Sequence, residues 1–325
     1  MGKHNPNGRY DAAEAEYIKA SGAGRFDDSF SAFLARELTF IRTRVLEVRR
    51  APLRAFEVFP VQTDVPAGAA TAVQRIYDAV GVAKIIANYA DDLPRADVVG
   101  KEETVKVVTL GNSYGYNVVE VEHAQFAGVN LDMYRANAAR RGVDQKINSI
   151  AWFGDSAANI TGFLNHPNIT EVTLPADGTG SSTTFASKTP DQIIRDVNSM
   201  FNAIDVATNN VEFPDTLLLP TAAYDYMVGT PRSSYSDLTI LGFLRQAHPE
   251  VRFMKVGELS GAGSGGKDVM IAGRFEPDVV RLEIPERFRQ LPVEKRNLEY
   301  VVDCLSRVIG VTILVPLAFS KAEGV

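Results

Sequence analysis

Two stretches of the chain place apolar residues three or four positions apart, the spacing of an amphipathic helix. In the first stretch these positions are Phe30, Leu34, Leu38, Ile41, Val45 and Val48. In the second they are Phe126, Val129, Met133, Ala136, Ala139, Val143, Ile147 and Ile150. The second pattern predicts a helix of roughly seven turns, which Gly142 interrupts at a cost of about 1 kcal/mol relative to alanine.

The first helix follows a polar stretch, residues 1–27, that is typical of a loosely ordered arm, and Pro52 closes it. Its other faces carry arginines, namely Arg36, Arg42, Arg44 and Arg49. These side chains favour a solvated helix face. Alternatively, these arginines bind a partner molecule or nucleic acid.

Between Ala55 and Val121 the pattern changes to short β-type runs separated by turn residues. The predicted strands are Phe56 to Val61, Thr71 to Tyr77, Val80 to Ile86, Thr104 to Thr109 and Tyr116 to Val121. Several are polar on both faces and hold too few apolar residues to bury a core. Such a hairpin is poorly stable alone, so we expect it to lie on the same chain or on a neighbouring subunit.

Residues 166–273 show a mixed α/β pattern. Thr189 is the predicted cap of a helix with Pro190 in its first turn. The other predicted elements are a buried strand at Leu217 to Leu219, helices from Thr221 and from Leu238 to Ala247, and strands at Val251 to Val256 and Val269 to Ala272. From Phe275 onward, apolar runs predict long strands to the end of the chain.

The composition is that of an ordinary soluble globular protein, and 325 residues correspond to about two domains. A formal net charge of −6 makes any contact with nucleic acid local or weak. We find no signal peptide and no apolar run long enough for a membrane span, which favours a cytoplasm-like compartment. Cys304 is the single cysteine, so disulfides within the chain and CxxC sites are excluded.

Catalytic and ligand-binding motifs find little support. The glycine-rich stretch Gly261–Lys267 resembles a phosphate-binding loop, but Asp268 replaces the Ser or Thr that would hold magnesium. A strand rather than a helix is predicted to follow, so a flexible hairpin loop is favoured over nucleotide binding. Cys304 fits a small buried residue better than a nucleophile. The four histidines, His4, His123, His166 and His248, show no metal-ligand spacing.

One stretch carries a family resemblance. A predicted strand at Tyr116 to Val121 leads into the long helix, followed by Trp152-Phe153-Gly154 and then Gly162-Phe163-Leu164-Asn165. This order resembles the major capsid proteins of tailed bacteriophages, which have the Hong Kong 97 fold and share it with encapsulins. In that family the long helix is the spine of the peripheral domain, and a Gly-apolar-Leu-Asn turn leads from it into the axial domain.

The resemblance implies an α+β, Hong Kong 97-like capsid fold. Residues 1–54 would be an N-terminal arm and helix, and residues 55–118 an extended β-hairpin, the E-loop, that lies on a neighbouring subunit. Residues 119–165 together with 274–325 would form the peripheral domain, and residues 166–273 a mixed α/β axial domain. Some members crosslink an E-loop lysine to a neighbour's asparagine. No partner can be identified for Lys84 or Lys101, the only lysines between Ala55 and Val105, and no crosslink is predicted.

The implied function is structural: many copies would assemble, as rings of five and six, into the icosahedral shell of a phage head around the genome. No catalytic, cofactor-binding or metal-binding residue is predicted. Expected partners are other copies, with scaffolding, portal and decoration proteins and weakly contacted double-stranded DNA, and no membrane. The protein would be made in the bacterial host cytoplasm and reside in the virion. Opposite charge suggests contacts between subunits that join Asp91, Asp92, Glu102 or Glu103 to Arg140 and Arg141.

Two alternatives remain open at this point. An encapsulin-type compartment with the same fold would store a cargo enzyme, with a cargo-peptide groove often formed with an N-terminal helix such as residues 30–49. An enzyme that binds nucleotide through Gly261–Lys267 belongs to a different class. A portal or tail protein is disfavoured by length and by the mixture of predicted elements.

Overall fold

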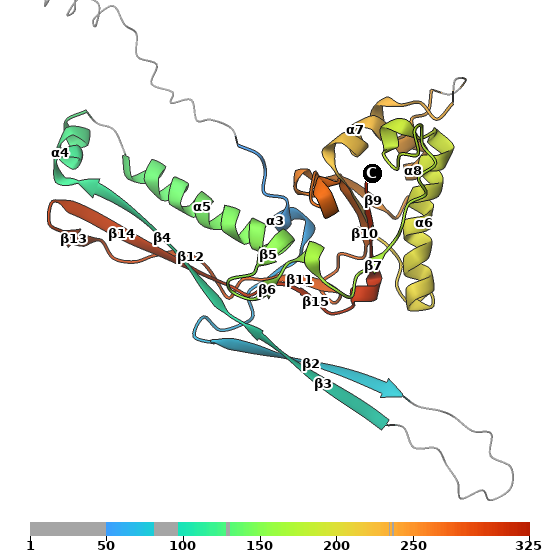
Figure 1. Ribbon diagram of the computed structural model, residues 1–325. Helices are drawn as coiled ribbons and strands as arrows, with labels where there is room; N and C mark the ends of the chain where they lie inside the picture. The colour runs from blue at the N-terminus through green and yellow to red at the C-terminus, as the bar shows by residue number, and fades with distance from the viewer. Residues whose placement is uncertain (1–49, 81–96, 128–130, 234, 236) are drawn as a thin grey trace, which may run out of the picture. The chain divides into compact units, whose positions relative to one another are not determined.

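The computed structural model describes residues 50–80, 97–127, 131–233, 235 and 237–325 (Figure 1). The contacts divide the chain into residues 1–51 and 52–325, and the second unit is described below. The predicted arm at 1–27 and the predicted helix from Phe30 to Val48 lie outside the described residues.

The first described element is helical where a strand was expected. The prediction of a strand from Phe56 to Val61 is wrong, because α3 (Ala55–Val58) precedes a two-residue strand, β1 (Val61–Gln62). The backbone N–H of Ala55 donates to Asn148 Oδ1 at 2.9 Å, and the N–H of Arg54 donates to Glu258 Oε1 at 3.2 Å. Side chains that are distant in the sequence therefore accept hydrogen bonds from the free amide groups at the start of this short helix. The local pattern of apolar and polar residues could not predict these contacts.

A long two-stranded hairpin follows. Strands β2 (Thr71–Val80) and β3 (Asp97–Lys106) pair antiparallel over ten positions, from Thr71 opposite Lys106 to Val80 opposite Asp97. Within the described part of the chain neither strand pairs with any other strand. The predicted strand at Val80 to Ile86 lies outside the described residues after its first position.

The next strand belongs to a different sheet. Strand β4 (Val108–Asn117) pairs antiparallel with β14 (Glu299–Val308) over ten positions, so the hairpin is shorter than the expected 55–118. Strands β12 (Glu286–Gln290) and β13 (Glu294–Arg296) share the other edge of β14. The polar character of β4 has a local cause, since Asn112 Nδ2 on this strand donates to the carbonyl of Ala139 on the helix above it at 3.2 Å.

The predicted long helix is two helices, α4 (Val118–Ala127) and α5 (Leu131–Phe153). The strand expected to continue to Val121 ends at Asn117, whose side chain accepts a hydrogen bond from the N–H of Val119 at 3.1 Å. Glu120 Oε2 in turn accepts from the N–H of Asn117, which completes the reciprocal contacts of a capping box. Helix α5 runs through Gly142, where an added Cβ would lie 3.2 Å from Asn112 Nδ2.

A five-stranded sheet lies at the other end of this unit, beside α6, α7 and α8 (Figure 1). Its strands, in spatial order, are β7 (Thr170–Glu171), β16 (Phe319–Glu323), β10 (Val269–Gly273), β8 (Thr216–Leu219) and β9 (Arg252–Lys255). The helices are α6 (Pro190–Thr208), α7 (Thr221–Gly229) and α8 (Ile240–Ala247). The predicted strand at Leu217 to Leu219 and the predicted helices are confirmed.

The central strands are apolar on both faces because both faces are buried. Leu217 and Leu219 join a core with α6, α7 and α8, whereas Leu218 between them faces a second core that contains the end of α5. The second core also takes in a three-stranded sheet of β1, β11 (Val280–Glu283) and β15 (Gly310–Ile313). Strands β8, β9 and β10 therefore contribute alternate residues to the two hydrophobic clusters.

Three details of this region bear on the sequence predictions. Thr189 is the N-cap of α6, with Pro190 at the first helical position, as predicted. Strand β16 lies in the five-stranded sheet, not with the other strands after residue 274. The glycine-rich segment is not a hairpin loop, because β8 lies between the two strands that flank it, β9 and β10.

Candidate functional site

The end of α5 is closed by two glycines whose backbones touch. Gly154 has a φ of +74°, and a Cβ there would lie 2.3 Å from the carbonyl oxygen of Ile160. A Cβ at Gly162 would lie 2.2 Å from the nitrogen of Gly154, so neither position has room for a side chain. Asn165 Nδ2 then donates to the carbonyl of Phe153 at 2.8 Å, which satisfies a carbonyl group at the helix end. The residues that carried the family resemblance are thus held together by direct contacts.

Aromatic rings surround this helix end. The Phe59 ring lies 4.9 Å from Trp152 and 5.1 Å from Phe163, and Phe163 lies 5.1 Å from Phe319. All four side chains are at most 2% exposed. They join the segment after α3, the end of α5, the turn that follows it and β16 into one packed unit.

One backbone hydrogen bond closes the base of the β2–β3 hairpin, and Arg307 on β14 joins this base to the rest of the unit. The N–H of Val107 donates to the carbonyl of Ala70 at 3.0 Å, and the Arg307 guanidinium donates to the carbonyl of Ala67. Arg307 also lies 3.6 Å from Glu286. The side chain of Val73, on β2, is 54% exposed, as expected for strands that lack a core of their own.

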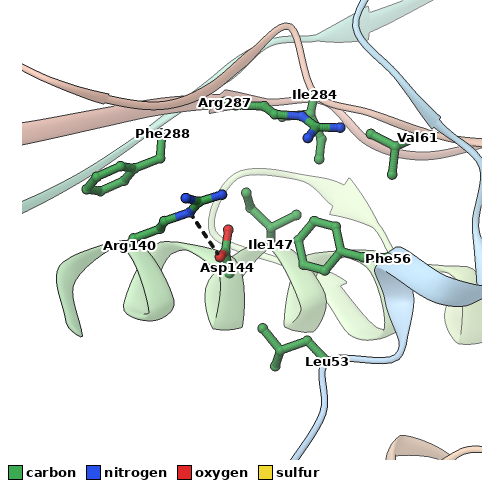
Figure 2. Close-up of a pocket in the computed structure, with 9 residues that line it drawn as sticks. All are labelled: Leu53, Phe56, Val61, Arg140, Asp144, Ile147, Ile284, Arg287 and Phe288. Carbon is green, nitrogen blue, oxygen red and sulfur yellow. Dashed lines mark ion pairs between the residues drawn. The ribbon is translucent and has the colours of Figure 1, made fainter. Parts of the chain in front are cut away.

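A pocket of about 370 Å³ opens between α5, α3 and the start of β12 (Figure 2). Its lining residues are Leu53, Phe56, Val61, Arg140, Asp144, Ile147, Ile284, Arg287 and Phe288. Burial raises the pKa of Asp144, and the nearby guanidinium groups of Arg140, Arg287 and Arg141 only partly oppose this. The Arg140–Asp144 contact is long, 4.0 Å. The pocket is therefore an apolar hollow with two arginines and one carboxyl group whose pKa is raised.

Backbone amide groups of the glycine-rich segment donate hydrogen bonds to carboxylates of the same chain. The N–H of Gly261 donates to Asp268 Oδ1 at 2.8 Å, and the N–H of Ser264 donates to Glu323 Oε2 at 3.0 Å. Although burial alone would raise the pKa of Glu323, the bonds from Ser264 and the charges of nearby lysines hold it below its ordinary value. Two carboxylates occupy the place of a phosphate, and strand β10 rather than a helix follows. The segment is therefore not arranged to bind nucleotide.

The residues considered for redox, nucleophilic or metal chemistry are not brought together. Cys304 is fully buried, and its burial, together with Asp303, raises the pKa of its thiol. His123 is exposed on α4, whereas His248 contacts Asn198 Oδ1 at 3.0 Å. Among the described residues, no group of three His, Cys, Asp or Glu side chains could hold a metal ion. Likewise, no helix in this part of the chain is both long and apolar enough to cross a bilayer.

A buried ion network fixes the start of α6. Lys188 is completely buried, and its ammonium group contacts Asp196, which is also buried, and lies 3.5 Å from Asp177. Arg195 contacts Asp177 at 2.6 Å and Asp196 at 2.7 Å. The hydrogen bond from Arg195 lowers the pKa of Asp177 below its ordinary value. The segment that contains Asp177 is thereby held against the first two turns of α6.

The charged residues expected to meet between subunits are only partly described. Asp91 and Asp92 lie outside the described residues, and Glu102 is exposed on β3. Arg140 is exposed and faces Asp144 of its own chain. The proposed pairing between subunits therefore stays a prediction.

Comparison with known proteins identifies the family. The sequence profile of the major capsid protein family matches residues 81–325, about three quarters of the chain. The chain belongs to the major capsid protein family. It is a structural protein of a capsid shell, and the packed glycines and aromatic rings after α5 organise the centre of that subunit. A search among curated proteins found no sequence match.

Solved structures show the fold of this capsid subunit. The capsid of Myoviridae phage XM1 superposes with a TM-score of 0.75 at 19% identity and covers 90% of this chain and 98% of its own. The capsid of a native GTA particle superposes with a TM-score of 0.60 at 10% sequence identity. The match covers 88% of this chain and 95% of the GTA chain. An encapsulin from Synechococcus elongatus PCC 7942, solved as the holo-SrpI complex, superposes with a TM-score of 0.56 at 12% sequence identity. The match covers 90% of this chain and 95% of the encapsulin chain. The expected α+β, Hong Kong 97-like fold is confirmed.

Two surface features of this subunit were not predicted from the sequence. The pocket in Figure 2 joins residues near positions 55, 145 and 286, which only the folded chain brings together. Exposed apolar side chains at the end of α6 were also missed. A signal existed there, since Val211 and Phe213 follow two asparagines that end the helix.

Proposed function

We propose that copies of this chain self-assemble, as rings of five and six, into the icosahedral head shell of a tailed phage that encloses double-stranded DNA. The observation that carries the proposal is the β2–β3 hairpin. Its ten paired positions find no further strand partner in the described part of the chain. A hairpin of this kind gains stability by lying on another subunit, which would link neighbours in a closed shell.

In this proposal the parts of the chain take separate roles. Within residues 55–118 the β2–β3 hairpin reaches a neighbour and β4 joins the sheet of β14, and residues 119–165 with most of 274–325 form the peripheral domain around α5. Residues 166–273, completed by β16, form the axial domain near the centre of each ring. Residues 1–54 would cross between subunits. Scaffolding, portal and decoration proteins would act on this shell, which requires no catalysis.

The test is negative-stain electron microscopy of the purified protein after size exclusion, with absorbance at 260 and 280 nm. We expect closed shells or flat rings with five-fold and six-fold symmetry. Particles from infected or induced cells should contain nucleic acid and show a high 260/280 ratio. A small uniform particle at every salt concentration would contradict self-assembly. Shells filled with one protein species would instead favour an encapsulin-type compartment.

A further inference from the structure

Three apolar side chains at the end of α6 and in the segment that follows it are exposed. Val206, Val211 and Phe213 are 78%, 70% and 59% exposed, and they fall within eight residues of one another. Single exposed apolar residues are common on protein surfaces, but a cluster marks an interaction site. These three residues are called the apolar knob below.

The turn that carries the apolar knob is held in a defined conformation. Asn209 and Asn210 both have left-handed backbones, with φ values of 53° and 59°. Asparagine adopts this conformation more readily than other residues that have a side chain. The turn is folded back on the helix by the N–H of Asn210, which donates to the carbonyl of Asp205 at 2.8 Å. The knob is therefore presented by a fixed turn.

The charge around the apolar knob is negative. Glu212 pairs with Arg274 at 2.7 Å, and the same guanidinium pairs with Glu276 at 2.6 Å. Asp205 has no ion pair among the described residues. Glu212 and Glu276 thus share one arginine, and the formal charge of these side chains beside the knob is negative.

The pocket in Figure 2 has the complementary properties. Its apolar wall includes the rings of Phe56 and Phe288, and its volume of about 370 Å³ is large enough to accept an aromatic side chain. Arg140 and Arg287 stand at its edge against the single carboxyl group of Asp144. Two guanidinium groups against one carboxylate leave the pocket with a net positive charge, opposite in sign to the surroundings of the knob.

We propose that the apolar knob of one copy seats in the α3–α5 pocket of a second copy, with Phe213 as the inserted side chain. The inference rests on the proposed self-assembly and names one of its contacts. Each copy uses the knob on one side and the pocket on the other, so the contact runs head to tail. Repetition of such a contact closes a ring when its rotation divides a full turn. A buried aromatic anchor surrounded by complementary charge is the usual form of an energetic centre in protein interfaces.

The experiment is crosslinking, in assembled particles, between variants that each carry one introduced cysteine. Phe213→Cys and Phe288→Cys are made on copies with different tags, assembled together and treated with a short bis-maleimide. The native Cys304 is buried and does not interfere. We expect a linked dimer that carries both tags. The matched control is Phe126→Cys, which is 97% exposed on α4 and should not link to Phe288→Cys.

Each outcome decides between the two levels of the proposal. Particles that form without a mixed dimer overturn the knob-and-pocket contact and leave self-assembly standing. A dimer of Phe213→Cys copies alone overturns it too, since the knob would then meet itself. Absence of rings and shells from the unmodified chain would refute self-assembly itself. As a second readout, Phe213→Asp should raise the protein concentration needed for assembly at least tenfold while leaving the circular dichroism spectrum unchanged.

Discussion

Replacing Gly162 with alanine tests whether the contact between the two glycines holds the end of α5 in place. The new Cβ would lie 2.2 Å from the nitrogen of Gly154 and 2.6 Å from the carbonyl oxygen of Trp152. Since Cβ atoms do not approach other heavy atoms closer than 3.0 Å, the two backbones must separate by roughly 0.8 Å. Backbone cannot rotate away as a side chain can, and overpacking of this kind costs about 2–3 kcal/mol.

The assay is urea unfolding of the unassembled subunit, followed by tryptophan fluorescence. Trp152 is the single tryptophan and lies at the perturbed site, so its emission reports directly on the change. With an m-value of about 2–3 kcal/mol/M, the midpoint should fall by about 1 M. Gly257→Ala is the matched control, because a Cβ there meets nothing within 4 Å. If both variants unfold at the same urea concentration, the steric argument is refuted.

Three further predictions concern buried charge and the glycine-rich segment. Lys188→Ala should destabilise the subunit by about 3 kcal/mol, because it removes a buried partner of Asp196. The control Lys146→Ala breaks an exposed ion pair and should cost less than about 1 kcal/mol. Thermal unfolding of both variants measures the difference. Glu283 is buried, and burial raises its pKa above the ordinary 4.5, so the folded state favours the protonated form and stability falls as the pH rises through that pKa. Glu283→Gln should therefore stabilise the subunit at pH 7 and lose this advantage below about pH 4.5, and a gain that did not depend on pH would contradict the assignment. Calorimetric titration with Mg-ATP should show no binding and no change in Lys267→Ala, and saturable binding abolished by that substitution would overturn our reading of the segment.

Local signals in the sequence predicted local structure well. Thr189 and Pro190 specify the start of α6 within a few residues, and the structure confirms it. Asn117 and Glu120 hold the same kind of information for α4, but the β-branched residues beside them favoured a strand. The predicted strand from Tyr116 to Val121 rested on β propensity, and the side-chain contacts of Asn117 and Glu120 begin a helix there instead.

Features that depend on distant residues could not be predicted. The pairing of β4 with β14 joins positions nearly two hundred residues apart, and no local pattern identifies the partner. The pocket between α5, α3 and β12 could not be predicted for the same reason, because its lining residues are distant in the sequence. The family resemblance succeeded because Gly154 and Gly162 have no room for a side chain, so the contact itself appears in the sequence as glycine.

The position of β16 has a consequence for how the subunit is made. This strand lies between β7 and β10, hydrogen-bonded to both, yet it is the last of the five strands to be synthesised. Until residues 319–323 leave the ribosome, β7 has no neighbour and β10 has one open edge. Pairing between strands so far apart in the sequence is also intrinsically slow. The five-stranded sheet is therefore completed only after residues 319–323 have been synthesised, so a shorter growing chain does not yet have the complete fold of this region.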